Sequence, residues 1–376
     1  VRVDAGTPTF QRAPGESTGT LALESAMDEL AYALGIDPLE LRLRNHADVD
    51  PKDGKPWSSK SLRACYQAGA ERFGWNRRDP KPRSMRDGRW LIGWGMATAT
   101  YPARQSPSSA KATARPDGTL LVRAGTQDIG TGTYTIMSQI AADALGVPVD
   151  KVRFELGDTT FPETPVSGGS QTASSTGSAV KMACLELRKK VAALGRVDPA
   201  GPVDYRAIAA RPGAPELSAE YHAQEKNERK NHSCHSFGAD FVEVRVDPEL
   251  GQVRVSRVVA AFGAGKILNA KTARSQFMGG IVWAMGMALE EHTVRDARTA
   301  RVVTRDLADY HVPVNADVPA IDIVTIDEED PYVNEIGAKG IGEIGITGAA
   351  AAIANAVFHA TGKRIRDMPI TLDKLI

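Results

Sequence analysis

The sequence predicts an α+β fold, in which helices and mixed sheets follow one another without a regular βα repeat. Helical periodicity, with apolar residues every three or four positions, dominates 17–45 and 62–73. Strand-like stretches then appear at 120–123, 152–156 and 241–246. A composition of 42% hydrophobic and 24% charged residues is ordinary for a globular protein and argues against wholesale disorder.

Two helices are predicted near the N-terminus, within 17–45. The buried face of the first should consist of four residues at spacings of three and four: Leu23, Met27, Leu30 and Leu34. Gly35 suits the end of this helix, because glycine readily takes the left-handed conformation there. Asp37 and Pro38 then provide an N-cap and a first residue for the second helix.

The rest of the chain mixes strand and helix signals. The predicted order is a strand at 120–123, a helix at 133–145, a strand at 152–156, a helix at 179–193, a hairpin at 241–255, a helix at 272–289, a strand at 321–326 and an alanine-rich helix ending near 360. This order divides the chain into four parts: a helical segment at 1–90, an α+β lobe at 91–200, an irregular linker at 201–235 and a second α+β lobe at 236–376.

The charges balance, with 46 Lys and Arg against 46 Asp and Glu, so the formal net charge is zero. This balance argues against nucleic acid or an anionic membrane as a bulk electrostatic partner. The acidic run 327–330 is predicted to be a solvated turn after a strand. The most apolar stretches, 277–289 and 346–358, are shorter than the roughly 20 residues that a membrane span needs.

Three widely spaced cysteines, Cys65, Cys184 and Cys234, predict neither a disulfide framework nor a zinc or iron–sulfur site. His232 and His235 flank Cys234, but they lie in a polar segment just before a strand. No residue of this chain is therefore predicted to be a metal ligand.

Four loops, each directly before a predicted helix, combine glycine with polar residues: 11–16, 125–133, 168–177 and 340–345. Backbone N–H groups at a helix N-terminus favour an anion, and glycine lets the backbone approach a ligand closely. None of the loops has the spacing of a P-loop or of a dinucleotide-binding turn. One such loop could serve packing alone, but four in one neutral chain favour a large polar or phosphate-bearing cofactor.

Glu343 is the one carboxylate in the glycine-rich loop 337–348. Two roles are open to it from spacing alone. A carboxylate in an uncharged, desolvated loop is a candidate general base. An acidic residue directly before a helix can instead cap that helix.

These loops, in this order, resemble those of the molybdenum hydroxylases of the xanthine dehydrogenase and aldehyde oxidase family. The stretches that carry the resemblance are 11–16, 23–29, 125–133, 241–246, 275–280 and 339–343. The resemblance is to the second half of the molybdenum-binding subunit, and 54–59 continuing to Trp75 look most like bacterial aldehyde oxidases. It implies mixed-sheet lobes of a molybdenum-cofactor-binding domain: a cofactor-binding lobe at 91–200 that the helical segment 1–90 continues, and a lobe at 236–376 that carries the catalytic glutamate.

The resemblance also implies roles for single residues. Glu343 matches the glutamate that acts as general base beside the molybdenum, with water supplying the oxygen. Arg12 and Ala13 match the loop beside the metal, and Gln276 matches a glutamine that bonds the pterin. The other implied cofactor contacts are Gln127, Asp128, Gly130, Thr131, Gly132, Thr133, Gly169, Ser170, Gln171, Thr172, Lys339, Gly340 and Gly342. The pterin dithiolene, not the protein, holds the metal in this family, and bacterial members usually carry a cytosine dinucleotide form of the pterin.

Two departures from the family pattern bear on the site. Thr131 stands where many relatives have glutamine, so that contact is lost or made by Gln127. The Gly-Gly-Phe-Gly loop of the family's first half does not occur here, nor do iron–sulfur cysteine motifs or a flavin-binding segment. The expected partners are therefore the first half of the molybdenum subunit, an iron–sulfur subunit and an FAD subunit. Arg104 aligns loosely with the substrate pocket as a contact to an anion or carbonyl, with a solvated surface arginine as the alternative.

The resemblance implies oxidation of small aldehydes to carboxylic acids, with electrons passed to the iron–sulfur and flavin partners. Hydroxylation of an N-heterocycle of the xanthine or isoquinoline kind is the alternative within the family. An inactive, cofactor-free fragment is the alternative outside it. The compartment stays open between bacterial cytoplasm and periplasm.

Overall fold

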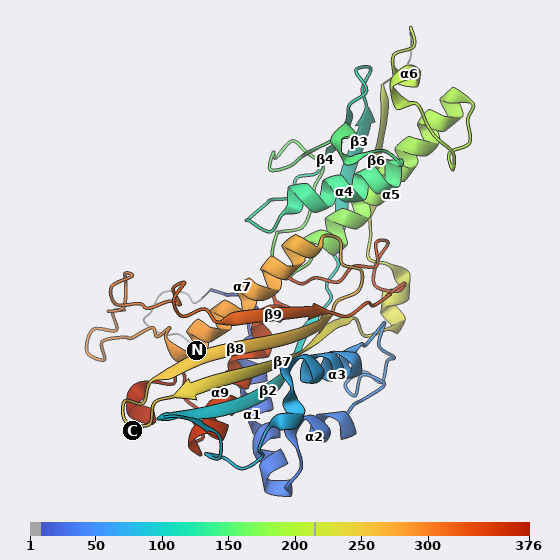
Figure 1. The fold of residues 1–376 in the computed structure, drawn as a ribbon. Coiled ribbons are helices and arrows are strands. Elements are labelled where there is room, and N and C mark those ends of the chain that lie inside the picture. Colours follow the sequence, from blue (N-terminus) through green and yellow to red (C-terminus); the bar gives the residue numbers. More distant parts are fainter. Residues whose placement is uncertain (1–8, 214–215) are drawn as a thin grey trace.

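The computed structural model describes residues 9–213 and 216–376. Two sheets organise the described chain: a five-stranded sheet of order β1-β2-β7-β8-β9 and a four-stranded sheet of order β5-β4-β3-β6. Figure 1 shows the two sheets at opposite ends of an elongated molecule, each with its own helices. We call these two parts the five-stranded lobe and the four-stranded lobe. The predicted mixture of helices with mixed sheets is confirmed.

The five-stranded lobe is built on two long antiparallel strands, β2 (Trp90–Pro102) and β7 (His235–Val246), paired from Leu91 opposite Val246 to Pro102 opposite His235. The predicted hairpin joins β7 to β8 (Val253–Gly263), and β9 (Ala320–Thr325) runs parallel to β8. The short β1 (Arg86–Asp87) closes the other edge. Helix α3 (Leu62–Phe73) packs against β7 and β8, whereas α9 (Ala349–Thr361) packs against β2 and β7.

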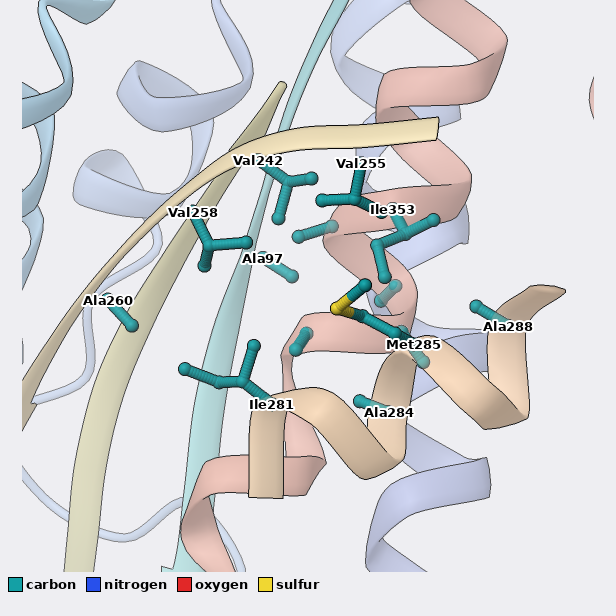
Figure 2. Close-up of a cluster of buried hydrophobic side chains, with 14 of the residues drawn as sticks. Ala97, Val242, Val255, Val258, Ala260, Ile281, Ala284, Met285, Ala288 and Ile353 are labelled. Atoms are coloured by element: carbon teal, nitrogen blue, oxygen red, sulfur yellow. The ribbon is translucent and has the colours of Figure 1, made fainter. Parts of the chain in front are cut away.

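Helix α9 lies unusually close to the sheet because small residues meet there. A Cβ added at Gly95 of β2 would lie 2.2 Å from the Ala356 nitrogen, so only glycine permits this approach. Figure 2 shows Ile353 of α9 and Met285 of α7 (Ala270–Leu289) among the valines of the sheet. The stretch formed by α8 (Ile344–Thr347) and α9 is long and apolar enough to cross a membrane by composition, contrary to prediction, but 89% of it is buried inside the protein.

The four-stranded lobe contains four strands and two long helices. Strand β3 (Ser108–Ala114) pairs antiparallel with β4 (Leu120–Arg123) and with β6 (Leu217–Ala223), and β5 (Val152–Glu155) runs parallel to β4. Helices α4 (Thr133–Leu145) and α5 (Thr172–Gly195) pack against each other and against this sheet. The short α6 (Tyr205–Ala209) follows α5.

Three parts of the sequence-based organisation were wrong. Segment 201–235 is not an irregular linker, since it contains α6 and the edge strand β6. The lobes are not continuous in sequence either, because β2 pairs with β7 while β3, only six residues after β2, belongs to the other sheet. Neither β2 nor β3 was predicted: β2 contains two glycines and β3 three alanines, residue types that are depleted in strands.

The first two helices form where predicted, as α1 (Glu16–Leu34) and α2 (Pro38–Arg44), and the Asp37 carboxylate caps α2. The predicted buried face of α1 was wrong. Leu23, Leu30 and Leu34 are exposed, whereas Glu24 and Asp28 on the opposite face are buried. The inward-facing acids are stabilised by arginines, which periodicity of apolar residues cannot reveal.

Candidate active site

A cleft with a volume of about 520 Å³ lies between the two lobes. Its walls come from five chain segments: 10–12, 129–136, 167–173, 266–276 and 338–343, with Trp283 at its edge. The first turns of α4, α5 and α7 all contribute residues to these walls. The four glycine-containing loops that the sequence singled out therefore meet in one place, although they are separated by up to 330 residues.

Glu343 lies in this cleft, half-buried, at the residue before α8. Its side chain makes no capping hydrogen bond to that helix. The carboxylate instead accepts hydrogen bonds from the Ser170 hydroxyl, 2.9 Å from Oε2, and from the Ala13 backbone N–H, 3.1 Å from Oε1. The capping role is therefore wrong, and the carboxylate faces the cleft with partners from two distant loops.

Arg12 closes the site from the N-terminal side. Its guanidinium donates to the Gln276 carbonyl oxygen at 2.9 Å and to the Gly342 carbonyl oxygen next to Glu343. Burial lowers the pKa of Arg12, and the nearby Glu343 carboxylate opposes that shift. The arginine thus ties the N-terminal loop to α7 and to the loop that carries the candidate base.

Ser170 has a strained backbone at the centre of the site, with a φ of 58°. Its carbonyl oxygen presses on Gly340, where an added Cβ would lie 1.8 Å from that oxygen. Glycine at 340 therefore allows the loop of Glu343 to lie directly against Ser170. The structure places Ser170 as a partner of the candidate base, a contact that the sequence did not predict.

Tyr101 lies close to the Glu343 carboxylate. It is 1% exposed, and its hydroxyl has no hydrogen-bond partner among residues 9–213 and 216–376. Burial raises the pKa of Tyr101, and the nearby Glu343 carboxylate adds to that effect. Arg104 lies over the Tyr101 ring at 5.7 Å and 3.8 Å from the Glu16 carboxylate. Because the Arg104 side chain is half exposed and does not line the cleft, a direct catalytic role for it has no support in the geometry.

Lys339 lines the cleft with its backbone, but its amine points into the protein. The nitrogen lies 2.6 Å from Glu328 and 3.3 Å from Asp330, and all three side chains are almost fully buried. Ser58 and Ser59 donate to the same carboxylates. Glu328 and Asp330 are therefore a buried anchor for the Glu343 loop, whereas Asp327 and Glu329 of the same acidic run are exposed as predicted. Lys339 is not available as a charged cofactor contact.

The loop 125–133 is stabilised by hydrogen bonds to one of its own side chains, the Asp128 carboxylate. The Asp128 carboxylate accepts hydrogen bonds from the N–H groups of Gly130 at 2.9 Å, Thr131 at 3.0 Å and Gly132 at 3.4 Å. Gln127 accepts a hydrogen bond from Ser167 N–H at 3.2 Å, so it joins this loop to the next. Neither Asp128 nor Gln127 lines the cleft, and the N–H groups expected to face an anion are already engaged.

The remaining predicted contacts divide into two groups. The first group lines the cleft: Thr131, Thr133, Gly169, Ser170, Thr172, Gln276, Gly340 and Gly342, together with Arg12 and Glu343. It is not lined by Ala13, Gly130, Gly132 or Gln171. Ala13 acts through its N–H on Glu343, and Gln171 accepts a hydrogen bond from Ser106 at 2.7 Å outside the cleft.

Sequence reasoning missed the wall made by 266–273. Lys266, Asn269 and Thr272 line the cleft, and the Asn269 side chain caps α7 through the Thr272 N–H at 3.0 Å. The cap was a detectable signal, since asparagine is a preferred N-cap residue. Lys266 follows Gly265, which has a φ of 64°, and takes part in no ion pair within the described chain. Its amine is therefore a candidate cation, together with the Arg12 guanidinium, for an anionic ligand in the cleft.

Comparisons with known proteins agree with this geometry. Two family models, both described as a molybdopterin cofactor-binding domain, match residues 68–319 and 1–46. The chain is 42% identical to the aldehyde oxidoreductase molybdenum-binding subunit PaoC of Escherichia coli strain K12, over 97% of this chain and 51% of that subunit. It is 32% identical to the putative xanthine dehydrogenase molybdenum-binding subunit XdhA of the same organism, over 97% and 52%.

The fold agrees as well. The aldehyde oxidoreductase structure from Desulfovibrio desulfuricans superposes with a TM-score of 0.83 at 26% identity, covering 97% of this chain and 40% of that one. The chain thus spans about half the length of the curated relatives it matches. Because the first domain model covers well over half of the residues, the chain belongs to the family of molybdopterin cofactor-binding domains found in molybdenum-dependent oxidoreductases.

Proposed function

We propose that this chain is the cofactor-binding and base-carrying part of a molybdenum hydroxylase that oxidises aldehydes to carboxylic acids. The observation that carries the proposal is the placement of Glu343 in a cleft between two lobes, held by Ser170 and Ala13. The 42% identity to a subunit named for aldehyde oxidation supports aldehydes over the heterocycles named by more distant relatives.

The cleft fits a molybdopterin by the chemistry of its donors. Hydroxyls of Thr131, Thr133, Thr172 and Thr272 and the amides of Asn269 and Gln276 line its walls. Such groups suit a polar, uncharged ring system. Lys266 and the first turn of α5, which has no side-chain cap, suit a phosphate. We infer that these residues hold the pterin and its phosphate, and that a cytosine nucleotide extends it.

Glu343 is the group that would move a proton. Ser170 and Ala13 each donate to one of its oxygens, so they fix the plane of the carboxylate and keep it an acceptor. Arg12 holds the Gly342 carbonyl, which fixes the backbone directly before the base. When bound, the molybdenum centre would supply the oxygen transfer and take up two electrons. Glu343 would take the proton that is released as oxygen from water reaches the aldehyde carbon.

Electrons must then leave the site. The chain has three isolated cysteines, two of them buried, and no cluster of three metal-ligating side chains among the described residues. We propose that iron–sulfur and FAD groups on partner chains accept the electrons, and that the unmatched half of a molybdenum-binding subunit completes the site.

Metal and nucleotide analysis of the purified complete complex tests the cofactor proposal. Molybdenum and cytidine monophosphate, released by acid hydrolysis, should each approach one per chain. Absence of both would instead support an inactive, cofactor-free fragment. Lys266→Met should lower the cofactor content, whereas Lys271→Met, at an exposed position of α7 outside the cleft, should not.

A substrate panel tests the reaction. Small aldehydes should give higher kcat/KM than xanthine or isoquinoline in the complete complex. Faster turnover of the heterocycles would favour the N-heterocycle alternative without changing the assignment of the cofactor or the base.

A further inference from the structure

Six acidic side chains are buried in the part of the chain that the structure describes, and five of them pair with a lysine or arginine. These five are Glu24, Asp28, Asp247, Glu328 and Asp330. The sixth, Asp240 of β7, is 0% exposed, and neither of its oxygens has a hydrogen-bond partner within 9–213 and 216–376. An ionised carboxylate without a partner is costly to bury, so the burial of Asp240 needs a separate explanation.

Asp240 faces the junction of α8 and α9. Its neighbours on the adjacent strands β2 and β8 are Ala97 and Ala260, which lie in the apolar cluster of Figure 2. A Cβ added at Gly348, between the two helices, would lie 2.3 Å from Asp240 Oδ2 and 3.0 Å from the Thr98 carbonyl oxygen. Because residue 348 has no side chain, the carboxyl group and this carbonyl can both lie against the backbone of the junction.

The charges that face Asp240 favour the neutral acid. Its charged neighbour is the Glu24 carboxylate of α1, which repels a second carboxylate although Arg42 pairs with it. Burial raises the pKa of Asp240 well above its ordinary value, and Glu24 adds to that effect. Helices α8 and α9 contain no Asp, Glu, Lys or Arg, and their one titratable residue, His359, lies near the far end of α9.

Helix α3 packs on the other face of the sheet. Successive residues of a strand point to opposite faces, and Phe241, the residue after Asp240, lies against Gly69 of α3. The titratable side chains that α3 buries against the sheet are Cys65 and Tyr66, and burial raises the pKa of both. Neither of them supplies a positive charge to Asp240.

We propose that Asp240 is a positioning residue, which as a neutral carboxylic acid holds the junction of α8 and α9 against the sheet and thereby fixes the place of Glu343. The connection is short, because Glu343 directly precedes α8 and Gly348 directly follows it. Lys339 anchors the other end of the same loop. The consequence for Glu343 rests on the proposed function, whereas the protonation of Asp240 does not.

Difference infrared spectroscopy of the full chain tests the protonation. At pH 8, the spectrum of the unsubstituted chain minus that of Asp240→Asn should contain the C=O band of a protonated carboxylic acid. This band should shift when aspartate is labelled with ¹³C. The matched control is Asp143→Asn, at an exposed position of α4, whose difference spectrum should contain carboxylate bands only. A carboxylate band for Asp240 would overturn the proposal.

Unfolding equilibria give a second test of the protonation. An aspartate in the unfolded chain has a pKa of about 3.9, so between pH 6 and pH 8 Asp240 keeps its proton only in the folded chain. Its contribution to stability is therefore lost as the pH rises above about 3.9. The unfolding constant of the unsubstituted chain, divided by that of Asp240→Asn, should rise about tenfold per pH unit from pH 6 to pH 8. A ratio that does not change with pH would contradict the neutral acid.

Hydrogen exchange and kinetics of the complete complex test the positioning. Amide exchange over 344–352 should be about tenfold faster in Asp240→Ala, which removes the carboxyl group, and unchanged in Asp240→Asn, which keeps its shape and polar atoms. The kcat per bound molybdenum should fall about tenfold in Asp240→Ala and recover in Asp240→Asn, with KM unchanged. Normal exchange and normal kcat in Asp240→Ala would overturn the positioning role.

The tests separate this proposal from the proposed function. Circular dichroism shows whether Asp240→Ala is folded, and the infrared and unfolding tests use only Asp240→Asn. The infrared, unfolding and exchange measurements need no substrate. The expected results in these three, together with no aldehyde turnover by the unsubstituted complex, would count against the proposed reaction and not against the role of Asp240 at the junction.

Discussion

Glu343 is held by two donors of different kinds, a backbone N–H from Ala13 and a side-chain hydroxyl from Ser170. Only the hydroxyl can be removed by substitution without moving the chain. The residue identities could be predicted from the sequence, since both lie in loops recognised there. Their contact could not, because Ser170 and Glu343 are 173 positions apart and Ser170 takes a φ of 58°.

Comparing Ser170→Ala with Ser170→Gly separates the effect of the Ser170 hydroxyl from the effect of its backbone conformation. Both remove the hydrogen bond to Glu343, but glycine also relieves the strained φ. We expect kcat/KM of the complete enzyme to fall by about 10- to 100-fold in both, since a hydrogen bond to a charged group contributes roughly 1.5–3 kcal/mol. Near-normal kcat/KM for the glycine variant alone would show that backbone conformation, not the hydroxyl, is what matters.

His359 predicts a pH dependence of stability. Its ring is fully buried, with Nδ1 accepting from the Trp94 N–H at 2.9 Å and Nε2 donating to the Asp79 carbonyl at 2.7 Å. Burial, reinforced by Arg78, lowers the pKa of His359 to about 4. The unfolded chain, with an ordinary histidine pKa of about 6.5, binds the proton more readily. Stability is therefore lost as the pH falls from about 6.5 to about 4.

Urea unfolding checks this prediction. The free energy of unfolding should be about 2 kcal/mol lower at pH 5 than at pH 7 through His359 alone. His359→Gln should flatten that part of the profile, whereas His311→Gln, at an exposed site, should leave the slope unchanged. An unaltered slope in His359→Gln would contradict the assignment.

At the scale of elements, the sequence predicted helices and hairpins well where a local signal existed. Gly35, Gly146 and Gly362 end α1, α4 and α9 in the left-handed conformation, as expected. Strand β2 was missed because it is buried on both faces, so its apolar residues do not alternate with polar ones. It also contains glycines, which the close contact with α9 requires. The buried face of α1 was assigned wrongly because it combines buried acids that pair with arginines and a few apolar residues, such as Ala31, instead of the leucines.

The Lys339 anchor gives a prediction for the loop that carries the base. Lys339→Met leaves Glu328 and Asp330 buried without their cation. The free energy of unfolding should fall by about 3–5 kcal/mol, the usual cost of breaking a buried ion pair from one side. Lys271→Met, at an exposed position, should change it by less than about 0.5 kcal/mol. A small effect of Lys339→Met would mean that the two carboxylates are satisfied by Ser58, Ser59 and backbone groups alone.

At the scale of the whole molecule, two lobes meet at one cleft, and the glycine-rich loops of both supply its walls. The sequence predicted these loops and the family, but not the sheets to which they belong. Chain order hides the arrangement, because β2 and β7, neighbours in one sheet, are separated by the whole four-stranded lobe. The formal net charge of zero agrees with a cleft whose polar lining consists mainly of hydroxyls and amides, with Lys266 and Arg12 as cations.

The base assignment is tested most directly by turnover of Glu343→Gln in the complete enzyme, expressed per bound molybdenum. Glutamine keeps the size, and its one carbonyl oxygen can still accept from the Ala13 N–H while its NH2 group donates to the Ser170 hydroxyl, but it cannot take up a proton. We expect molybdenum content to stay normal and kcat to fall by about 10²- to 10⁴-fold, the usual contribution of a general base. Glu220→Gln, at an exposed position of β6, should behave like the unsubstituted enzyme. Normal turnover of Glu343→Gln with full molybdenum would contradict the account.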